Sequence, residues 1–203
     1  MSSRIDQKAQ TRQRILATAK DLFESRGFAA TSLREIAHGA GVATGTVFVH
    51  FEDKRDLLHT ALFDDLEAKL TEISSLAPGP SLQRWLETVT DHVLTYYESR
   101  PGVSRVLLKE SLFADPPWAQ RFSAQFTTLH SSVARRARMD IDAGLLQASL
   151  DPTMFGLAYV SYYMFGLLAW AQQSHPEPRR MVSGLVAHHL APHAASPTKK
   201  VSP

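Results

Sequence analysis

The sequence predicts an all-α protein with a small helical head followed by a larger helical region, about nine helices in total. Three observations predict this fold class. Apolar residues recur at steps of three and four, glycine and proline fall between the apolar runs, and no segment alternates apolar and polar residues as a strand does. The length of 203 residues is sufficient for a small domain and a larger one.

Four helices are expected in and directly after the head, over residues 5–25, 31–41, 44–50 and 53–75. Gly27 supplies a left-handed stop for the first of them. Ser32 and Glu35 have the spacing of a capping box, which starts the second. Asp53 is placed to cap the fourth. The sequence therefore predicts two short helices between two longer ones.

After a loop at 76–81, five further helices are expected over residues 81–99, 101–113, 116–142, 152–174 and 178–190. Asp115-Pro116 and Asp151-Pro152 share one start signal, a capping aspartate followed by proline at the first helical position. The last segment, 192–203, is rich in Pro, Ala, Ser and Lys, and we expect it to be disordered.

Composition excludes several classes of site. The sequence has no cysteine, so disulfides, thiolate zinc sites and cysteine nucleophiles are excluded. The first 14 residues are polar and do not resemble a signal peptide, which makes a cytoplasmic location the expectation. Residues 1–55 carry nine Lys/Arg and six Asp/Glu, so the basic excess lies at the start, where a polyanion would be met.

One apolar stretch requires a membrane interpretation to be weighed. Residues 153–174 contain no charged side chain and are long enough to span a bilayer. The stretch also carries Ser161, Tyr162 and Tyr163 at its middle and lacks flanking basic clusters. We therefore interpret it as a helix buried in the protein or in an oligomer interface, and expect no membrane association.

The segment 31–51 has the pattern of a helix-turn-helix. Ala37 is small where two crossing helices come closest, and Gly41 stands in the turn, where a positive φ favours glycine. Val47 directs the second short helix back at the first. In the functional interpretation the second helix enters the major groove of DNA. The alternative is a compact helical corner within a larger bundle.

In the DNA interpretation, Thr44 and Thr46 offer hydroxyls and methyls to base edges, and Gly45 lets the backbone approach closely. Lys54 and Arg34 are placed to reach phosphates, and Lys8 joins Arg4 in a basic N-terminal arm. The full set of expected DNA-binding residues is Arg4, Thr31, Arg34, Thr44, Gly45, Thr46, Phe48, His50 and Lys54.

The head resembles that of the TetR (tetracycline-repressor-like) family over about residues 10–58. The resemblance rests on Thr11-Arg12, Ile15-Leu16, Leu22-Phe23, Gly27-Phe28, Thr31-Ser32, Ile36-Ala37, Ala40-Gly41-Val42, Gly45-Thr46, His50-Phe51, Lys54 and Leu57. It implies a cytoplasmic homodimer, usually a repressor, that a small molecule releases from operator DNA. It also implies nine or so helices, the last two of which build the dimer interface.

Two positions depart from the family pattern. Ala43 stands where the family usually has serine, and Thr44 is expected to take over the capping role. Phe48 stands where the family usually has tyrosine, which keeps the packing and removes one hydroxyl that would bind phosphate. We expect a DNA-binding head at 1–55, an effector-binding and dimerisation domain at 56–191 and the tail at 192–203.

The larger region is rich in aromatic side chains, which are typical either of a ligand pocket or of a plain core. The residues expected to bind a small apolar or aromatic effector are His92, Phe126, His130 and Tyr162. Helices 152–174 and 178–190 are expected to form the homodimer, with Gly156 and Gly166 permitting close approach. The alternative is that they pack within one subunit.

Signals for catalysis or metal binding are weak. His188, His189 and His193 cluster without a carboxylate, and the glycines of 39–45 follow a helix rather than the strand that a dinucleotide loop requires. We expect no metal, no cofactor and no enzyme. Two alternatives to the ligand-responsive regulator stay open: a non-specific DNA-binding protein without effector, and an all-α enzyme or ligand carrier that uses the corner as scaffold.

Overall fold

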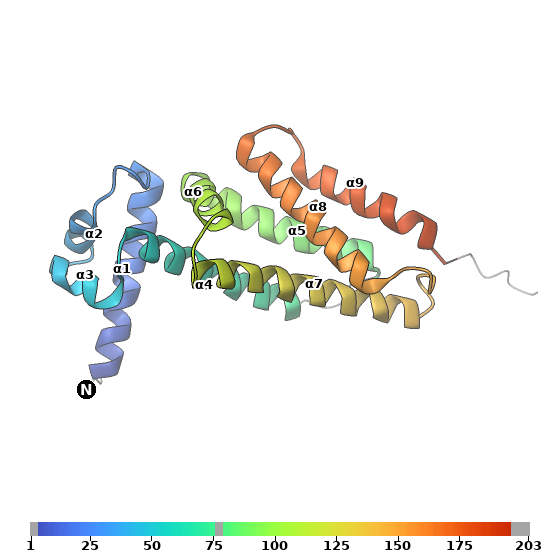
Figure 1. The fold of residues 1–203 in the computed structure, drawn as a ribbon, viewed down its shortest axis with the longest axis horizontal. Coiled ribbons are helices and arrows are strands. Elements are labelled where there is room, and N and C mark those ends of the chain that lie inside the picture. Colours follow the sequence, from blue (N-terminus) through green and yellow to red (C-terminus); the bar gives the residue numbers. More distant parts are fainter. Residues whose placement is uncertain (1–3, 76–78, 196–203) are drawn as a thin grey trace, which may run out of the picture. The chain divides into compact units, whose positions relative to one another are not determined.

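The computed structural model describes residues 4–75 and 79–195, which form nine α-helices and one short 3-10 helix (Figure 1). The helices are α1 (Arg4–Arg26), α2 (Leu33–Gly39), α3 (Thr44–His50), α4 (Lys54–Ser75), α5 (Leu82–Ser99), α6 (Pro101–Leu112), α7 (Trp118–Asp142), α8 (Pro152–Gln172), α9 (Pro178–Leu190) and η1 (Ala191–His193). The all-α prediction is confirmed.

The starts of α4 and α8 follow the capping chemistry of the sequence, whereas the start of α7 does not. Asp53 Oδ1 accepts a hydrogen bond from Asp56 N at 2.7 Å, and Asp151 caps α8 through the amides of its first turn. The prediction that α7 starts at Pro116 is wrong, because the helix begins at Trp118. Pro116 itself precedes Pro117, and a residue before proline is sterically kept out of the helical region.

The start of the predicted tail is ordered, which corrects the expectation of disorder from 192 onward. Gln147 N and Gln147 Nε2 donate to His193 O and Ala194 O, each at 2.8 Å. An isolated β-bridge joins Leu146 to Ala194. The chain after α9 is therefore tied to the loop after α7. The rest of the tail, 196–203, and loop residues 76–78 lie outside the described residues.

The chain divides into two compact units. The first comprises Met1–Lys69 and Tyr96–Phe122, and the second comprises Leu70–Thr95 and Ser123–Pro203. The first unit thus contains more than the head expected at 1–55, because the start of α4 and all of α6 belong to it.

In the first unit, α1 caps a helix far away in the sequence. The N-cap position of α6 is Arg100, which makes no side-chain cap. Glu24 of α1 supplies the acceptors instead, receiving hydrogen bonds from Gly102 N at 3.3 Å and Val103 N at 3.0 Å. Arg100 in turn donates to Asp21 of α1 at 3.2 Å. Three hydrogen bonds therefore fasten the start of α6 to α1.

In the second unit, a buried ion pair holds the start of α5. Asp140 of α7 accepts from Arg136 Nε at 2.9 Å and from Leu82 N at 2.7 Å. Arg136 also donates to Gly79 O at 3.3 Å, and its Nη1 has no partner among the described residues. Because both charged side chains are buried, their charges depend on these few contacts.

Helices α8 and α9 pack closely within the subunit (Figure 1). A Cβ added at Gly166 would lie 2.5 Å from Val182 Cγ2 of α9, and one added at Gly156 would lie 2.8 Å from His130 of α7. These glycines therefore serve packing inside one chain, rather than the dimer contact for which they were considered. Buried Tyr159 donates to or accepts from Thr90 of α5 at 3.0 Å.

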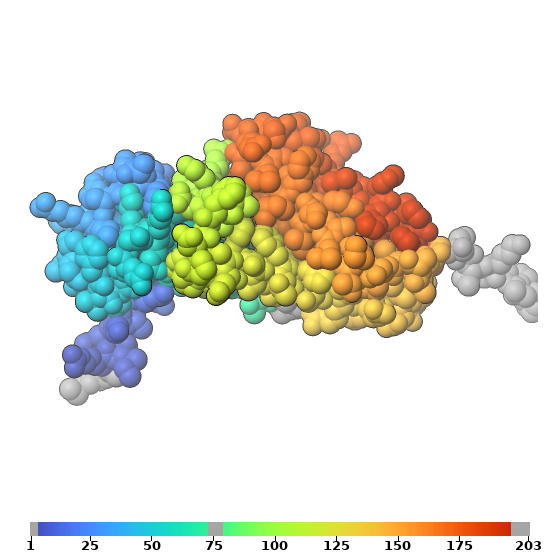
Figure 2. Space-filling view, in the orientation of Figure 1, coloured from blue at the N-terminus to red at the C-terminus, as the bar shows by residue number. Residues whose placement is uncertain are grey.

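Among the described residues, α8 is the one helix long and apolar enough to cross a membrane. One of its faces packs inside the second unit through Phe155, Tyr159 and Leu167. The opposite face leaves Leu157 and Phe165 exposed. Figure 2 shows part of the surface of this helix in orange. A helix with one face in the protein core has the pattern of a core helix whose other face is exposed.

Candidate nucleic-acid interface

The first short helix of the corner, α2, has a complete capping box. Ser32 N donates to Glu35 Oε2 at 2.8 Å, and Glu35 N donates to Ser32 Oγ at 3.2 Å. Hydrogen bonds from Ser32, followed by the charge of Arg26, lower the pKa of Glu35 below its ordinary value. The carboxylate therefore stays ionised and keeps the start of α2 in place.

The turn between α2 and α3 has the geometry that the sequence predicts. Gly41 has a φ of +64°, where a side chain would be strained. Val42 N donates to Ala37 O at 2.9 Å across the turn. Ala37 and Val47 are buried against each other's helices together with Ile36. The corner is thus held by its own short-range contacts and a small apolar core.

The second short helix, α3, begins at Thr44 with Ala43 as its N-cap residue. The expectation that Thr44 takes over the capping role is wrong, because the Ala43 backbone is extended and no side chain caps the helix. The departure at Ala43 therefore leaves the start of α3 without the side-chain acceptor that a serine would supply.

Most of the predicted DNA-binding residues are exposed or half-buried. Arg4, Arg34, Gly45 and Phe48 are exposed, while Thr44, Thr46, His50 and Lys54 are half-buried. Phe48 is 56% exposed and its neighbour Val49 is 69% exposed, so α3 presents apolar surface that has no packing role within the chain. The prediction omitted Val49, although its place after Phe48 on a short helix was a signal for it.

His50, at the end of α3, lies close to two cations. Burial, and then the charges of Lys8 and Arg12, lower its pKa below the ordinary value of 6.5. Its surroundings therefore favour the neutral form of the ring.

The side chains of Thr31 and Lys54 contact the backbone near the end of α1 instead of extending into solvent. Thr31 is buried, and its hydroxyl lies 2.9 Å from Gly27 O and 3.2 Å from Leu22 O at the end of α1. Lys54 Nζ donates to Phe28 O at 2.7 Å and to Thr31 O at 2.8 Å. Both residues join the α1–α2 corner to its neighbours, so the structure does not bring them together with Thr44, Gly45 and Thr46.

Residues 15–61 match the model of bacterial regulatory proteins of the tetR family. Over 182 residues the chain is 34% identical to the HTH-type transcriptional repressor Rv3405c of Mycobacterium tuberculosis, and the match covers 88% of each protein. The chain belongs to the TetR family. It is also 38% identical to the HTH-type transcriptional regulator AcrR of Shigella flexneri over 120 residues, which are 56% of this chain and 53% of that protein.

The TetR-family fold extends through both units. The transcriptional regulator FadR from Bacillus subtilis, solved in complex with stearoyl-CoA, superposes with a TM-score of 0.66. It is 14% identical in sequence, and the match covers 88% of this chain and 97% of that one. Family membership and the exposed corner make this protein a DNA-binding transcriptional regulator.

The four residues predicted to bind effector lie on three helices, α5, α7 and α8. His92 on α5 lies 2.8 Å from Thr88 O, and His130 on α7 lies 3.2 Å from Thr153 O. Tyr162 on α8 is 2.8 Å from His189 Nδ1 on α9. Phe126 is half-buried on α7. Three of the four are thus engaged in contacts within or between neighbouring helices.

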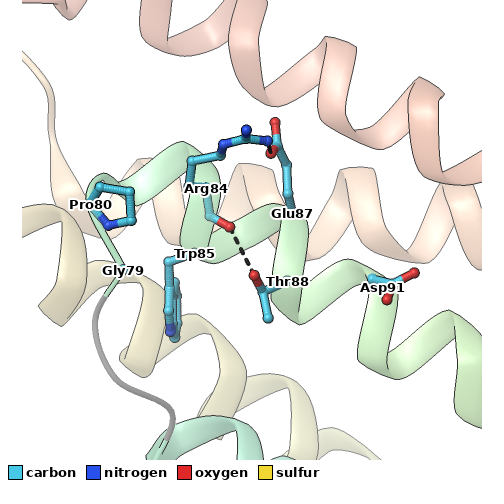
Figure 3. Close-up of a pocket in the computed structure, with 7 residues that line it drawn as sticks. All are labelled: Gly79, Pro80, Arg84, Trp85, Glu87, Thr88 and Asp91. Atoms are coloured by element: carbon cyan, nitrogen blue, oxygen red, sulfur yellow. Dashed lines mark hydrogen bonds and ion pairs between the residues drawn. The ribbon is translucent and has the colours of Figure 1, made fainter.

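A cleft of about 560 Å³ lies at the start of α5 in the second unit (Figure 3). It is lined by Gly79, Pro80, Arg84, Trp85, Glu87, Thr88 and Asp91. Figure 3 shows the Arg84–Glu87 ion pair at one edge and Trp85 at the other. Its volume is within the range of small-molecule sites. The sequence did not predict it, because it depends on the close approach of Gly79 to Trp85, where a Cβ added at Gly79 would lie 3.9 Å from Trp85 Cβ.

A second missed residue is His59, in the first unit. It is buried on α4, and its ring centre lies 5.0 Å from that of Trp118 and 5.7 Å from that of Phe63. Neither ring nitrogen has a hydrogen-bond partner among the described residues. Burial lowers its pKa, and Glu110 and two aspartates only partly oppose this. Nothing in the local sequence distinguishes this histidine from an exposed one.

Proposed function

We propose that this TetR-family regulator is a cytoplasmic repressor that binds operator DNA as a homodimer and is released by a small apolar or aromatic molecule. The observation that carries the proposal is the open face of α3. It presents Gly45 and Phe48 to solvent with Thr46 half-buried between them, and the capped α2 and the Gly41 turn precede it in the chain. A rigid short helix with an exposed first turn suits insertion into the major groove.

The proposed DNA contacts fall into two classes, those to base edges and those to phosphates. Thr44 and Thr46 serve base edges through hydroxyl and methyl groups, and Gly45 allows the backbone to come close. Phe48 lacks a hydroxyl for phosphate, so we assign it to apolar contact with a thymine methyl. Exposed Arg34 and Arg4 serve the phosphates.

The dimer is proposed to form through α8 and α9. Met154, Leu157 and Phe165 are 61%, 49% and 59% exposed and follow one face of α8 at helical spacing. An exposed apolar stripe of this kind marks an interaction surface. Two-fold symmetry would place two α3 helices on two half-sites, which a single short helix could not specify alone.

The effector is proposed to bind in the second unit. FadR was solved in complex with stearoyl-CoA, which supports a ligand-binding role for this fold. The cleft at Trp85 is one candidate site, and His92 lies next to it through Thr88. His130, Phe126 and Tyr162 define the other candidates, on α7 and α8. Ligand would act by binding more tightly to the conformation that does not bind DNA.

The DNA proposal is tested by anisotropy with a duplex from beside the protein's own gene, against a scrambled duplex, at about 150 mM salt. If that duplex shows no preference, a duplex selected from a random-sequence library takes its place. We expect specific binding that falls at least about tenfold in the double variant Arg34→Ala/Thr46→Ala. Thr127→Ala, on the exposed face of α7, is the matched control and should bind as before. Equal affinity for selected and scrambled duplexes would indicate a non-specific DNA-binding protein, and no binding at low salt would favour a carrier or an enzyme.

The dimer proposal is tested by sedimentation velocity. Phe165→Glu places a charge in the exposed stripe of α8 and should convert the dimer to monomer, because a desolvated carboxylate has no partner there. Met139→Glu is the control, since Met139 is also 51% exposed but lies on α7. A Phe165→Glu protein that sediments like the unaltered dimer would place the interface elsewhere.

A further inference from the structure

Lys54 is expected from the sequence to reach a phosphate, but its ammonium is already fully engaged. Nζ donates to Phe28 O at 2.7 Å and Thr31 O at 2.8 Å, and Ala29 O lies at 3.4 Å. The ammonium also lies 4.5 Å from the centre of the Phe28 ring, within the range of a cation–π interaction. A lysine has three donor hydrogens, and three backbone carbonyls face them here.

The partners of Lys54 all belong to the corner between α1 and α2. Phe28 packs on Phe23 of α1 with ring centres 5.2 Å apart, and the Thr31 hydroxyl bonds to the end of the same helix. Lys54 itself is the first residue of α4, four positions after α3 ends at His50. The lysine therefore joins the segment before α2 to the segment after α3.

The position of this lysine argues that the contact is specific. The first turn of a helix carries the positive end of its dipole, which disfavours a cation. Lys54 occupies that place in α4 nevertheless, and the carbonyls of the α1–α2 corner compensate its charge. The ends of α1 and α2 are thus fixed relative to α4, with the recognition helix between them.

We propose that Lys54 is a positioning residue for DNA recognition, which fixes the angle of α3 by joining the α1–α2 corner to α4, and that it is not a phosphate contact. The proposal rests on the proposed DNA-binding function. It assigns Lys54 to selectivity between sequences, because a misplaced α3 loses base contacts while the phosphate contacts of the head are kept.

The experiment compares Lys54→Met with Arg34→Met on two duplexes. One is selected from a random-sequence library by the unaltered protein and the other is its scrambled counterpart, and salt is varied from about 50 to 200 mM. For Lys54→Met we expect affinity for the selected duplex to fall about tenfold or more, with no change on the scrambled one and an unchanged salt slope. For Arg34→Met, which removes an exposed cation, we expect the slope to fall by about 0.9 for each phosphate that is no longer neutralised, and both duplexes to weaken alike.

The proposal is overturned if Lys54→Met lowers the salt slope as Arg34→Met does, or if it leaves affinity for the selected duplex unchanged. Circular dichroism melting establishes that each variant is folded at the assay temperature. If Lys54→Met is not, Lys54→Arg decides: it keeps the charge that a phosphate contact needs, so only a positioning role predicts a weaker sequence preference. Failure of the unaltered protein to select any duplex would instead contradict the proposed function.

Discussion

The corner that presents α3 and the second unit that contains α5 are held together in different ways. In the corner, the decisive contacts join residues close in sequence: Ser32 with Glu35, and Val42 with Ala37. In the second unit they join residues far apart: Leu82 with Asp140, and Thr90 with Tyr159. Local contacts leave a pattern in the sequence, whereas distant ones do not.

The two regions should therefore respond differently to mutation. The corner relies on backbone geometry and caps, each of which contributes about 1 kcal/mol. The second unit relies on a buried ion pair whose members have few other partners, so that removal of one leaves the other charged and desolvated. We therefore expect the largest decrease in stability from the second unit.

The strongest test removes the carboxylate of Asp140. Asp140→Ala should lower the free energy of unfolding by about 3–5 kcal/mol, because Arg136 is deprived of its counter-ion and Leu82 N of its acceptor. Urea unfolding followed by circular dichroism measures it. The control is Asp142→Ala on the exposed side of the same helix, which should change stability by less than about 0.5 kcal/mol. Equal decreases in the free energy of unfolding for the two variants would refute the expectation that the buried ion pair stabilises the second unit.

An intermediate effect is expected from paired glycine substitutions in the corner. Gly41→Ala should destabilise the protein by about 1–2 kcal/mol, because its φ of +64° is costly for any side chain while no neighbour lies within 4 Å. Gly45→Ala, in the first turn of α3 and equally open, should stabilise it by up to about 1 kcal/mol. Thermal melting separates the two variants, and decreases of similar size would mean that the positive φ of Gly41 does not set the cost of its substitution.

Gly45→Ala also tests whether Gly45 lies in the DNA interface. The added methyl projects from the face that is proposed to approach DNA, so operator affinity should fall although the fold becomes more stable. A variant that is more stable and binds DNA as before would remove Gly45 from the interface.

The smallest expected effect concerns pH. Burial lowers the pKa of His59 below its ordinary value of 6.5, so the unfolded chain binds the proton more readily than the folded one. Its contribution to stability is therefore complete above about pH 6.5 and decreases as the pH falls toward the folded-state pKa. Melting temperatures from pH 8 to about pH 5 should fall less steeply in His59→Phe. Parallel pH profiles would mean that His59 is not the group responsible.

How much of the protein could be predicted depends on the range of the contacts. The capping box at Ser32, the turn at Gly41 and the cap at Asp151 were predicted, because each signal and its partner lie within a few residues. The start of α7 was misplaced by two residues, because the effect of Pro117 on Pro116 was not weighed. The order of residues 192–195 could not be predicted, since their partners lie near Gln147.

Whether a residue of a candidate site could be predicted also depended on the range of its contacts. Arg34, Gly45 and Phe48, which are exposed, were predicted as DNA-binding residues because the helix-turn-helix pattern places them on the DNA side. The carbonyl contacts of Lys54 were not, because backbone oxygens 23 and 26 residues away carry no side-chain signal. The cleft beside Trp85 and the ring contact between His59 and Trp118 were not predicted either. Aromatic residues at helical spacing have the same sequence pattern whether they line a site or fill a core.

The fold class, the TetR-family head and most helix ends could be predicted from the sequence, because periodicity, capping and turn chemistry act over a few residues. Which side chains became free for recognition depended on tertiary packing. It turned Thr31 and Lys54 inward to the α1–α2 corner, left Val49 and Phe165 in solvent, and gave α6 its cap from Glu24. The physical reason is that such roles depend on partners brought together by packing, and packing joins residues without regard to their distance along the chain.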